Sequence, residues 1–197
     1  MKDWSDGLDE VPWENLKHAY GDAGDVPNLL LGLTSSDENV RKNSINELYG
    51  NIWHQGTVYE ATPYALPFLV RLHSIPDLPA HNDIATLLML IGAGRGFYEV
   101  HSTSGCLPLD GTILEDALIE EEQYRAKIRT KMLPILSDLV SYRHSSNRNL
   151  REVALGLIEA NRDYFDDAYK LIETALENET DETILEQMAE VLEYWDE

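Results

Sequence analysis

One six-residue pattern occurs twice: Ser36-Asp37-Glu38-Asn39-Val40-Arg41 returns as Ser146-Asn147-Arg148-Asn149-Leu150-Arg151. Each copy opens a segment whose apolar residues recur with helical spacing. Ser36 or Asp37 in the first copy, and the run Ser145-Ser146-Asn147 at the second, supply favourable N-cap residues, because their side-chain oxygens can accept the free N–H groups of a first helical turn. Such a repetition predicts helical hairpins, which bury little surface alone and gain a core by stacking.

Four such hairpins can be traced outward from the two copies. Their apolar helical segments cover residues 27–33 with 38–53, 61–75 with 82–91, 128–140 with 150–158, and 168–176 with 184–195. The segment 82–91 is apolar on most sides and should be central. No segment shows the alternation of a half-buried strand. We therefore expect an all-α fold, a short α-solenoid of about four stacked hairpins in a single domain over residues 1–197.

Two stretches depart from the repeat. Residues 1–24 precede the first hairpin and should act as an N-terminal capping segment, held down by Trp13. Residues 95–123 contain Gly105, Pro108 and Gly111, which predicts an insertion formed by a loop and a short acidic helix around 113–118. A long connection in a compact domain is either a functional loop or a mobile surface loop, and both interpretations stay open.

The charge is strongly acidic and concentrated at the two ends of the chain. The sequence has 36 Asp and Glu against 15 Lys and Arg, a net charge of −21, and residues 163–197 hold 13 acids and one Lys. This sign disfavours binding to duplex nucleic acid and to anionic membranes. It favours a basic protein partner, because opposite fields accelerate encounter. The alternative is that charged terminal repeats serve solubility.

The remaining bulk features indicate the compartment. Cys106 is the single cysteine, so no internal disulfide can form and a reducing environment is the simplest assignment. No charged-then-apolar leader opens the sequence, and the longest apolar stretch, 84–94, is too short to span a bilayer. We expect a soluble cytoplasmic protein.

No residue pattern predicts catalysis, a metal site or a cofactor. His101 and Cys106 lie close in sequence, but a nucleophile and base also need a rigid orienting group. His54-Gln55-Gly56-Thr57 predicts a tight turn with a polar hydrogen-bond network. The six His lack metal-site spacing, and the Gly92, Gly94 and Gly96 run follows a helix rather than a strand, so it indicates a helix end. We expect a protein that is not an enzyme.

The pattern resembles HEAT repeats, in which a Pro lies in the first helix and an Asp followed by an Arg begins the second. Pro27, Asp37 and Arg41 match this pattern, as do Pro134, Asn147 and Arg151. The last hairpin lacks both the Pro and the Arg, as a capping repeat can. The resemblance covers residues 25–197 and implies that the hairpins are HEAT-like.

A second resemblance is more local. Trp13-Glu14-Asn15-Leu16, His18-Ala19-Tyr20-Gly21-Asp22-Ala23 and His54-Gln55-Gly56-Thr57-Val58-Tyr59 look like segments of stand-alone bacterial HEAT-like proteins. Some proteins of that kind lie beside toxin genes and act as immunity proteins. The resemblance implies a non-catalytic protein that occludes a basic toxin.

The acids of the later helices are the expected partner-binding residues, since second helices usually line the concave face of such stacks. They are Glu152, Glu159, Asp163, Glu182, Glu186, Glu190 and Glu193, with Asp116, Glu120 and Glu121 on the insertion as a second patch. The competing hypothesis is an acidic scaffold or adaptor, including a mimic of nucleic-acid phosphate. Trp53 and Trp195 lie on apolar stripes and are expected in the core.

Overall fold

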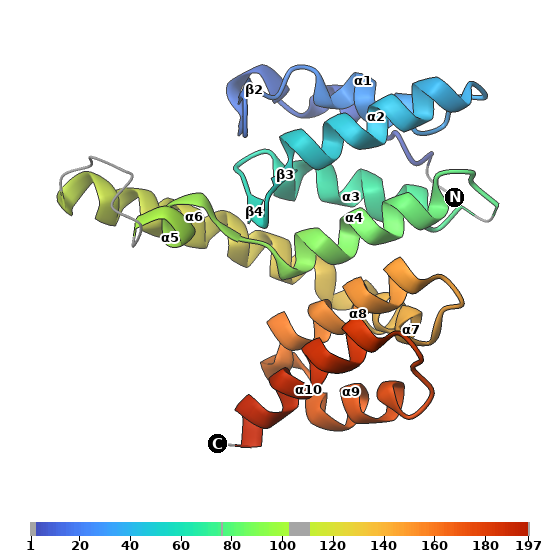
Figure 1. Cartoon of the computed structure of the whole chain (residues 1–197). Coiled ribbons are helices and arrows are strands. Elements are labelled where there is room, and N and C mark those ends of the chain that lie inside the picture. Colours follow the sequence, from blue (N-terminus) through green and yellow to red (C-terminus); the bar gives the residue numbers. More distant parts are fainter. Residues whose placement is uncertain (1–2, 76, 103–110, 197) are drawn as a thin grey trace. The chain divides into compact units, whose positions relative to one another are not determined.

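The computed structural model describes residues 3–75, 77–102 and 111–196 (Figure 1). The chain forms two compact units, an N-terminal unit, Met1–Leu133, and a C-terminal unit, Pro134–Glu197. Within the described residues, helices make up most of both units and the strands are only two residues long. The predicted helical class is thus confirmed, and the expectation that strands are absent is wrong. None of the described helices has the length and apolarity needed to cross a bilayer.

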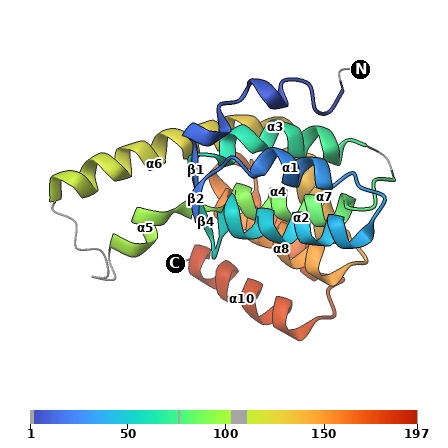
Figure 2. The ribbon, with the colours of Figure 1, turned by 90° about the horizontal axis from the view of Figure 1, so that it is seen from above.

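Two helical hairpins build the core of the N-terminal unit (Figures 1 and 2). They are α1 (Val26–Gly32) with α2 (Glu38–Asn51), and α3 (Thr62–His73) with α4 (His81–Ala93). Seven of the residues of α4 are buried, so the predicted central helix is confirmed. Pro67 lies inside α3 and does not mark its start, because the helix begins at Thr62 with Pro63 in its first turn.

Short strands connect these helices. β1 (Lys17–His18) pairs with β2 (Gly21–Asp22), and β3 (Trp53–His54) pairs with β4 (Thr57–Val58), both antiparallel; β5 (Arg95–Gly96) adds to β4 in parallel. Gln55 and Gly56 form the predicted tight turn with positive φ angles of 50° and 90°, as a two-residue hairpin requires. The Thr57 hydroxyl donates to the His54 carbonyl at 2.7 Å. Strands of two residues carry no readable alternation, which is why the sequence did not indicate them.

The N-terminal segment is held by Trp13. Its ring is buried, its Nε1 donates to the Leu8 carbonyl at 2.9 Å, and its centroid lies 6.2 Å from that of Phe68 on α3. Trp13 thus ties the segment to α3 of the second hairpin, and the Ala19 N–H donates to the Asn51 carbonyl at the end of α2, in the first hairpin, at 3.0 Å. Trp53 is half-buried rather than a core residue.

The 95–123 region differs most from its prediction. It contains β5, α5 (Phe97–His101) and the start of α6 (Gly111–Met132), a continuous helix of 22 residues. Gly105, Cys106 and Pro108 lie outside the described residues. α6 also replaces the start of the expected third hairpin, because it runs to Met132 and is followed by the 3₁₀ turn Leu133–Ile135. Pro134 has no N–H for a further helical bond and closes the N-terminal unit.

The C-terminal unit contains the last two hairpins. They are α7 (Leu136–Ser141) with α8 (Arg148–Ala160), and α9 (Ala168–Leu176) with α10 (Glu182–Asp196). The 3₁₀ turns Tyr142–His144 and Arg162–Tyr164 follow α7 and α8. Its buried apolar side chains come from all four helices and include Leu139, Leu157, Ile158, Ile172 and Ile184.

The repeated six-residue pattern forms the same structure twice. Asp37 accepts the Asn39 N–H at 2.8 Å, and Asn147 accepts the Asn149 N–H at 3.0 Å, as predicted for N-caps. The arginine four residues after each cap turns back in both copies. Arg41 donates to the Ser35 carbonyl at 2.7 Å, and Arg151 donates to the Ser145 carbonyl at 3.1 Å. The sequence repeat is therefore a repeat of hydrogen bonds.

Candidate functional site

A groove between α8 and the second half of α10 is the candidate site in the C-terminal unit. Its cavity measures about 450 Å³. It is lined by Glu159, Arg162, Gln187, Glu190, Val191, Tyr194 and Trp195. α10 buries only Ile184 and Met188, both in its first half, so the apolar side chains of its second half remain partly uncovered.

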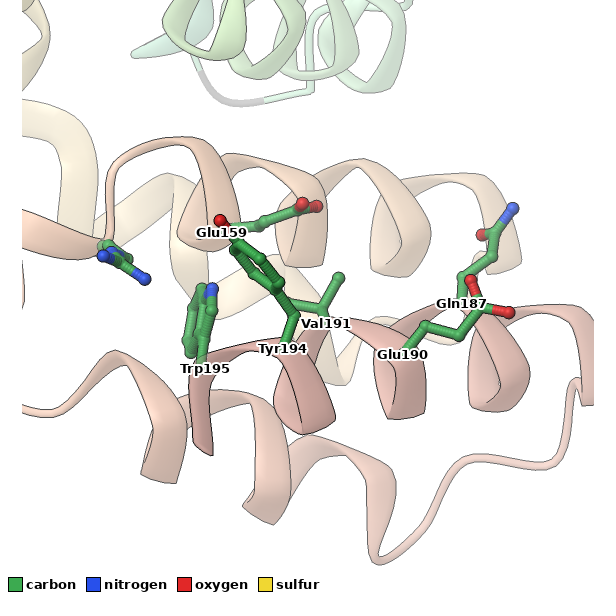
Figure 3. Close-up of a pocket in the computed structure, with 7 residues that line it drawn as sticks. Glu159, Gln187, Glu190, Val191, Tyr194 and Trp195 are labelled. Atoms are coloured by element: carbon green, nitrogen blue, oxygen red, sulfur yellow. The ribbon is translucent and has the colours of Figure 1, made fainter. Parts of the chain in front are cut away.

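Aromatic and acidic side chains share the groove (Figure 3). The Tyr194 ring rises from α10 toward the Glu159 side chain on α8, and Glu190 and Gln187 lie at the opposite end of the row from Trp195. Tyr194 is 72% exposed, which is unusual for so large an apolar surface on a packed helix. Trp195 is half-buried, which corrects its expected place in the core.

The groove already holds one cation beside an aromatic ring. The Arg162 guanidinium lies 5.7 Å from the centroid of Trp195, within the range of a cation–π contact. The same guanidinium is 3.7 Å from the Asp163 carboxylate, at the far limit of an ion pair. These contacts come from the turn that follows α8, so the end of α8 supplies both Glu159 and Arg162 to the site.

The electrostatics of the groove are acidic. Glu159 is exposed at its surface, yet partial burial of its carboxylate raises its pKa above the ordinary value. That direction means that the surroundings desolvate the charge more than they compensate it. The C-terminal unit has 16 acids and five Lys and Arg, and four of those five cations are engaged in ion pairs within the unit.

Two arginines at the start of α8, Arg148 and Arg151, fix the loop that precedes α10. Arg151 donates to both carboxylate oxygens of Glu179, at 2.7 and 2.9 Å, and this hydrogen-bonded pair lowers the pKa of Glu179 to about 2. Arg148 donates to Asp181 at 3.0 Å. Glu179 also accepts the N–H groups of Thr180 and Asp181. The loop before α10 is therefore tied to the start of α8, which sets the groove between the two helices.

The structure brings together only part of the predicted set. Glu159 and Glu190 line the groove; Glu182, Glu186 and Glu193 are exposed elsewhere on α10. Glu152 forms an ion pair with Arg148, and Asp163 pairs with Arg162. Asp116 and Glu120 are exposed on α6 in the other unit. The partner-binding role of all these residues stays a prediction.

Glu121 does not belong to the predicted patch. Only 3% of its surface is exposed, and its carboxylate accepts the N–H groups of Tyr98 and Glu99 at 2.8 and 3.1 Å. It therefore satisfies the first turn of α5 instead of facing a partner. Gly96 makes this possible, since a Cβ at that position would lie 2.6 Å from the Glu121 carboxyl carbon.

Sequence reasoning missed Arg162, Gln187 and Tyr194. Tyr194 follows Val191 by three residues, so a helical period places both on one face. That spacing was a usable signal for a shared face, but it could not show that the face is left partly open.

The remaining candidates from the sequence are the His101–Cys106 pair and a metal site. His101 Nδ1 is 2.8 Å from the Phe97 carbonyl and its ring stacks on Phe97; Cys106 lies outside the described residues, so their pairing is not addressed. In the part of the chain that the structure describes, no three His, Cys, Asp or Glu side chains are grouped as metal ligands.

No protein-family model matches the chain, and no curated protein or solved structure is significantly similar to it.

Proposed function

We propose that this protein is a non-catalytic binding module that holds a basic protein partner through the α8–α10 groove. The observation that carries the proposal is the lining of the groove, which combines the aromatic rings of Tyr194 and Trp195 with the carboxylates of Glu159 and Glu190. A lysine or arginine side chain of the partner fits this chemistry, because an aromatic face and a carboxylate both attract a cation. The acidic field of the unit accelerates encounter with such a partner.

The raised pKa of Glu159 supports the same occupant. A carboxylate whose charge is poorly compensated gains most when a cation arrives beside it. Arg162 beside Trp195 supplies a second argument, since the ring already accommodates a guanidinium at its face. A partner cation would share or displace that contact.

We further propose that the partner is a toxin domain and that the module neutralises it by covering its basic active cleft. The toxin part of the proposal rests on the resemblance of residues 13–23 and 54–59 to stand-alone bacterial HEAT-like proteins, some of which act as immunity proteins. The finer fold proposal belongs here as well: the four hairpins are HEAT-like repeats of a short α-solenoid, supported by the matched corners at Asp37 and Asn147. The single cysteine favours action in the reducing cytoplasm.

The test compares two variants with the same loss of charge. Glu159→Gln/Glu190→Gln removes two carboxylates from the groove, and Glu182→Gln/Glu186→Gln removes two exposed carboxylates from the first half of α10. Partners of the tagged chain are captured from its own cells with nuclease treatment. The proposal expects a stoichiometric basic protein that binds the wild type and the second variant, and binds the first at least about tenfold more weakly.

Two outcomes of this experiment would contradict binding through the α8–α10 groove. Equal loss of the partner in both variants would show that the unit attracts by net charge and that the groove is not the site. A large machine that binds both variants alike would favour the acidic adaptor or phosphate mimic.

A further inference from the structure

The first half of α6 extends away from the hairpins of the N-terminal unit, with α5 beside it (Figures 1 and 2). Towards the other end, Ile128 and Met132 are buried, and α6 contacts α3 and α4. Between residues 113 and 120 no side chain is buried. One helix thus has a packed end and an end that leaves its apolar residues at the surface.

That open end carries a shallow apolar groove. Its cavity measures about 380 Å³ and is lined by Leu114, Glu115, Leu118, Ile119 and Glu122. Ile119 is 54% exposed. A half-exposed isoleucine next to two further leucines on one helix is a surface that gains free energy when another apolar surface covers it.

The charges around the groove identify the kind of surface that would cover it. Residues 113–120 include Glu115, Asp116 and Glu120 and no Lys or Arg, whereas all four Lys and Arg of α6 lie between residues 125 and 131. Glu122 forms ion pairs with Arg125 and Arg129, so its charge is compensated within the helix. The rim of the groove is therefore acidic.

A second copy of the chain does not suit this rim. A symmetric dimer places each patch on itself, so Glu115 and Asp116 of one copy would face those of the other, in a protein of net charge −21. Like charges that face each other across an interface oppose association.

We propose that the first half of α6 is a docking surface for a basic amphipathic helix. Its apolar side chains cover Leu114, Leu118 and Ile119, and its flanking lysines or arginines face Glu115, which lines the groove, and Asp116, which lies one helical turn from Ile119. Laying an apolar helix face into a groove is a common mode of recognition, with anchors one helical turn apart. The surface lies in the N-terminal unit, so the proposal is independent of the α8–α10 groove.

The probe is a synthetic helix of about 18 residues, five turns, with leucines on one face and lysines on the other. A scrambled peptide of the same composition is the control for charge alone. Both are titrated into the full chain by fluorescence anisotropy at low salt and at about 0.5 M salt. We expect the amphipathic peptide to bind at least about tenfold more tightly than the scrambled one.

Two pairs of variants locate the binding. Ile119→Ala should weaken the amphipathic peptide about fivefold, while Val40→Ala, at a 43% exposed residue on α2, changes affinity less than about twofold. Alanine favours helix, so a loss of binding at Ile119 is not a loss of α6. Glu115→Gln/Asp116→Asn should weaken binding about tenfold at low salt and less at high salt, against no comparable change for Glu182→Gln/Glu186→Gln.

Equal binding of both peptides, or an unchanged affinity in Ile119→Ala, would overturn the proposal. So would sedimentation of the wild type as a dimer that Ile119→Ala converts to a monomer, because a second copy would then occupy the face. Glu159→Gln/Glu190→Gln should bind the peptide like the wild type, which separates this result from the test of the proposed function.

Discussion

The two corners that share the six-residue pattern are built alike and used differently. In both, a cap side chain accepts an N–H two residues later, and an arginine returns to a serine carbonyl. The second arginine, Arg151, also holds Glu179 through two hydrogen bonds. The comparison teaches that a local sequence repeat specifies a local structure, whereas the tertiary role of its arginine depends on what the rest of the chain brings beside it.

The largest expected effect separates the two arginines. Arg151→Ala leaves Glu179, whose side chain is only 2% exposed, without its cation. Removing one partner of an exposed pair costs up to about 1 kcal/mol and of a buried pair about 3–5 kcal/mol. Arg151 itself is 18% exposed, so we expect the C-terminal unit to lose an intermediate amount, about 2 kcal/mol. Urea unfolding followed by far-UV circular dichroism and by tryptophan fluorescence measures it, with Trp195 as the one tryptophan after residue 133 read in a background that has Phe at positions 4, 13 and 53.

Arg41→Ala is the matched control, read from the three remaining tryptophans, Trp4, Trp13 and Trp53, in a Trp195→Phe background. It removes the hydrogen bond to the Ser35 carbonyl and should lower the free energy of unfolding of the N-terminal unit by about 1 kcal/mol. Equal losses from the two arginines would show that Glu179 adds nothing to the second corner.

The next effect is a dependence on pH. Arg151 first, and then the N–H groups of Asp181 and Thr180, outweigh the effect of burial and lower the pKa of Glu179 to about 2. Because this pKa lies below the unfolded value, its stabilisation is complete above about pH 4.5 and is lost as the pH falls toward 2. After allowance for screening, the C-terminal unit should lose about 1 kcal/mol between pH 5 and pH 3 from this group. Urea titrations of Glu179→Gln at those pH values should lack this part of the change.

The two caps should be equivalent. Asp37→Ala and Asn147→Ala each remove the acceptor of a first-turn N–H. Each should lower the free energy of unfolding of its own unit by about 1 kcal/mol. The same fluorescence titrations apply. A difference above about 1 kcal/mol would mean that one cap has a further tertiary role.

The smallest effect concerns the groove. Partial burial raises the pKa of Glu159, so the group favours the folded state less as the pH rises above its unfolded value of about 4.3. Glu159→Gln should therefore raise the stability of the C-terminal unit at pH 7 by less than about 0.5 kcal/mol, since the group is largely screened by solvent. The gain should vanish near pH 3, where both states are protonated. A loss of stability at pH 7 would contradict the assignment of burial as the dominant influence.

The predictable parts of the fold were those that depend on neighbouring residues. The caps were located to Ser36 or Asp37 and to Ser145–Asn147, because a cap is defined by its own short side chain and the turn that follows, and the structure selects Asp37 and Asn147. The length of α6 was missed, because the acidic run Glu120–Glu122 separates the apolar positions up to Ile119 from Ile128 and Met132. The strands were missed because two residues show no alternation.

The parts of the site that escaped prediction depend on distant backbone. Glu121 is buried since α5 presents two N–H groups to it from more than 20 residues away, and nothing in the acidic run marks it as different from Glu120. Trp195 was placed in the core because helical spacing shows which face a residue occupies. Spacing does not show how much of that face a neighbouring helix covers.

The boundary between the two units, at Pro134, has a consequence for folding during synthesis. The N-terminal unit ends at Leu133, so all of its residues are synthesised before the C-terminal unit begins. The remaining 64 residues, Pro134–Glu197, take about 3–13 s to translate at 5–20 residues per second. Helical domains rich in local contacts fold in microseconds to milliseconds. On the ribosome the first unit therefore has time to fold by itself before the acidic C-terminal unit is complete.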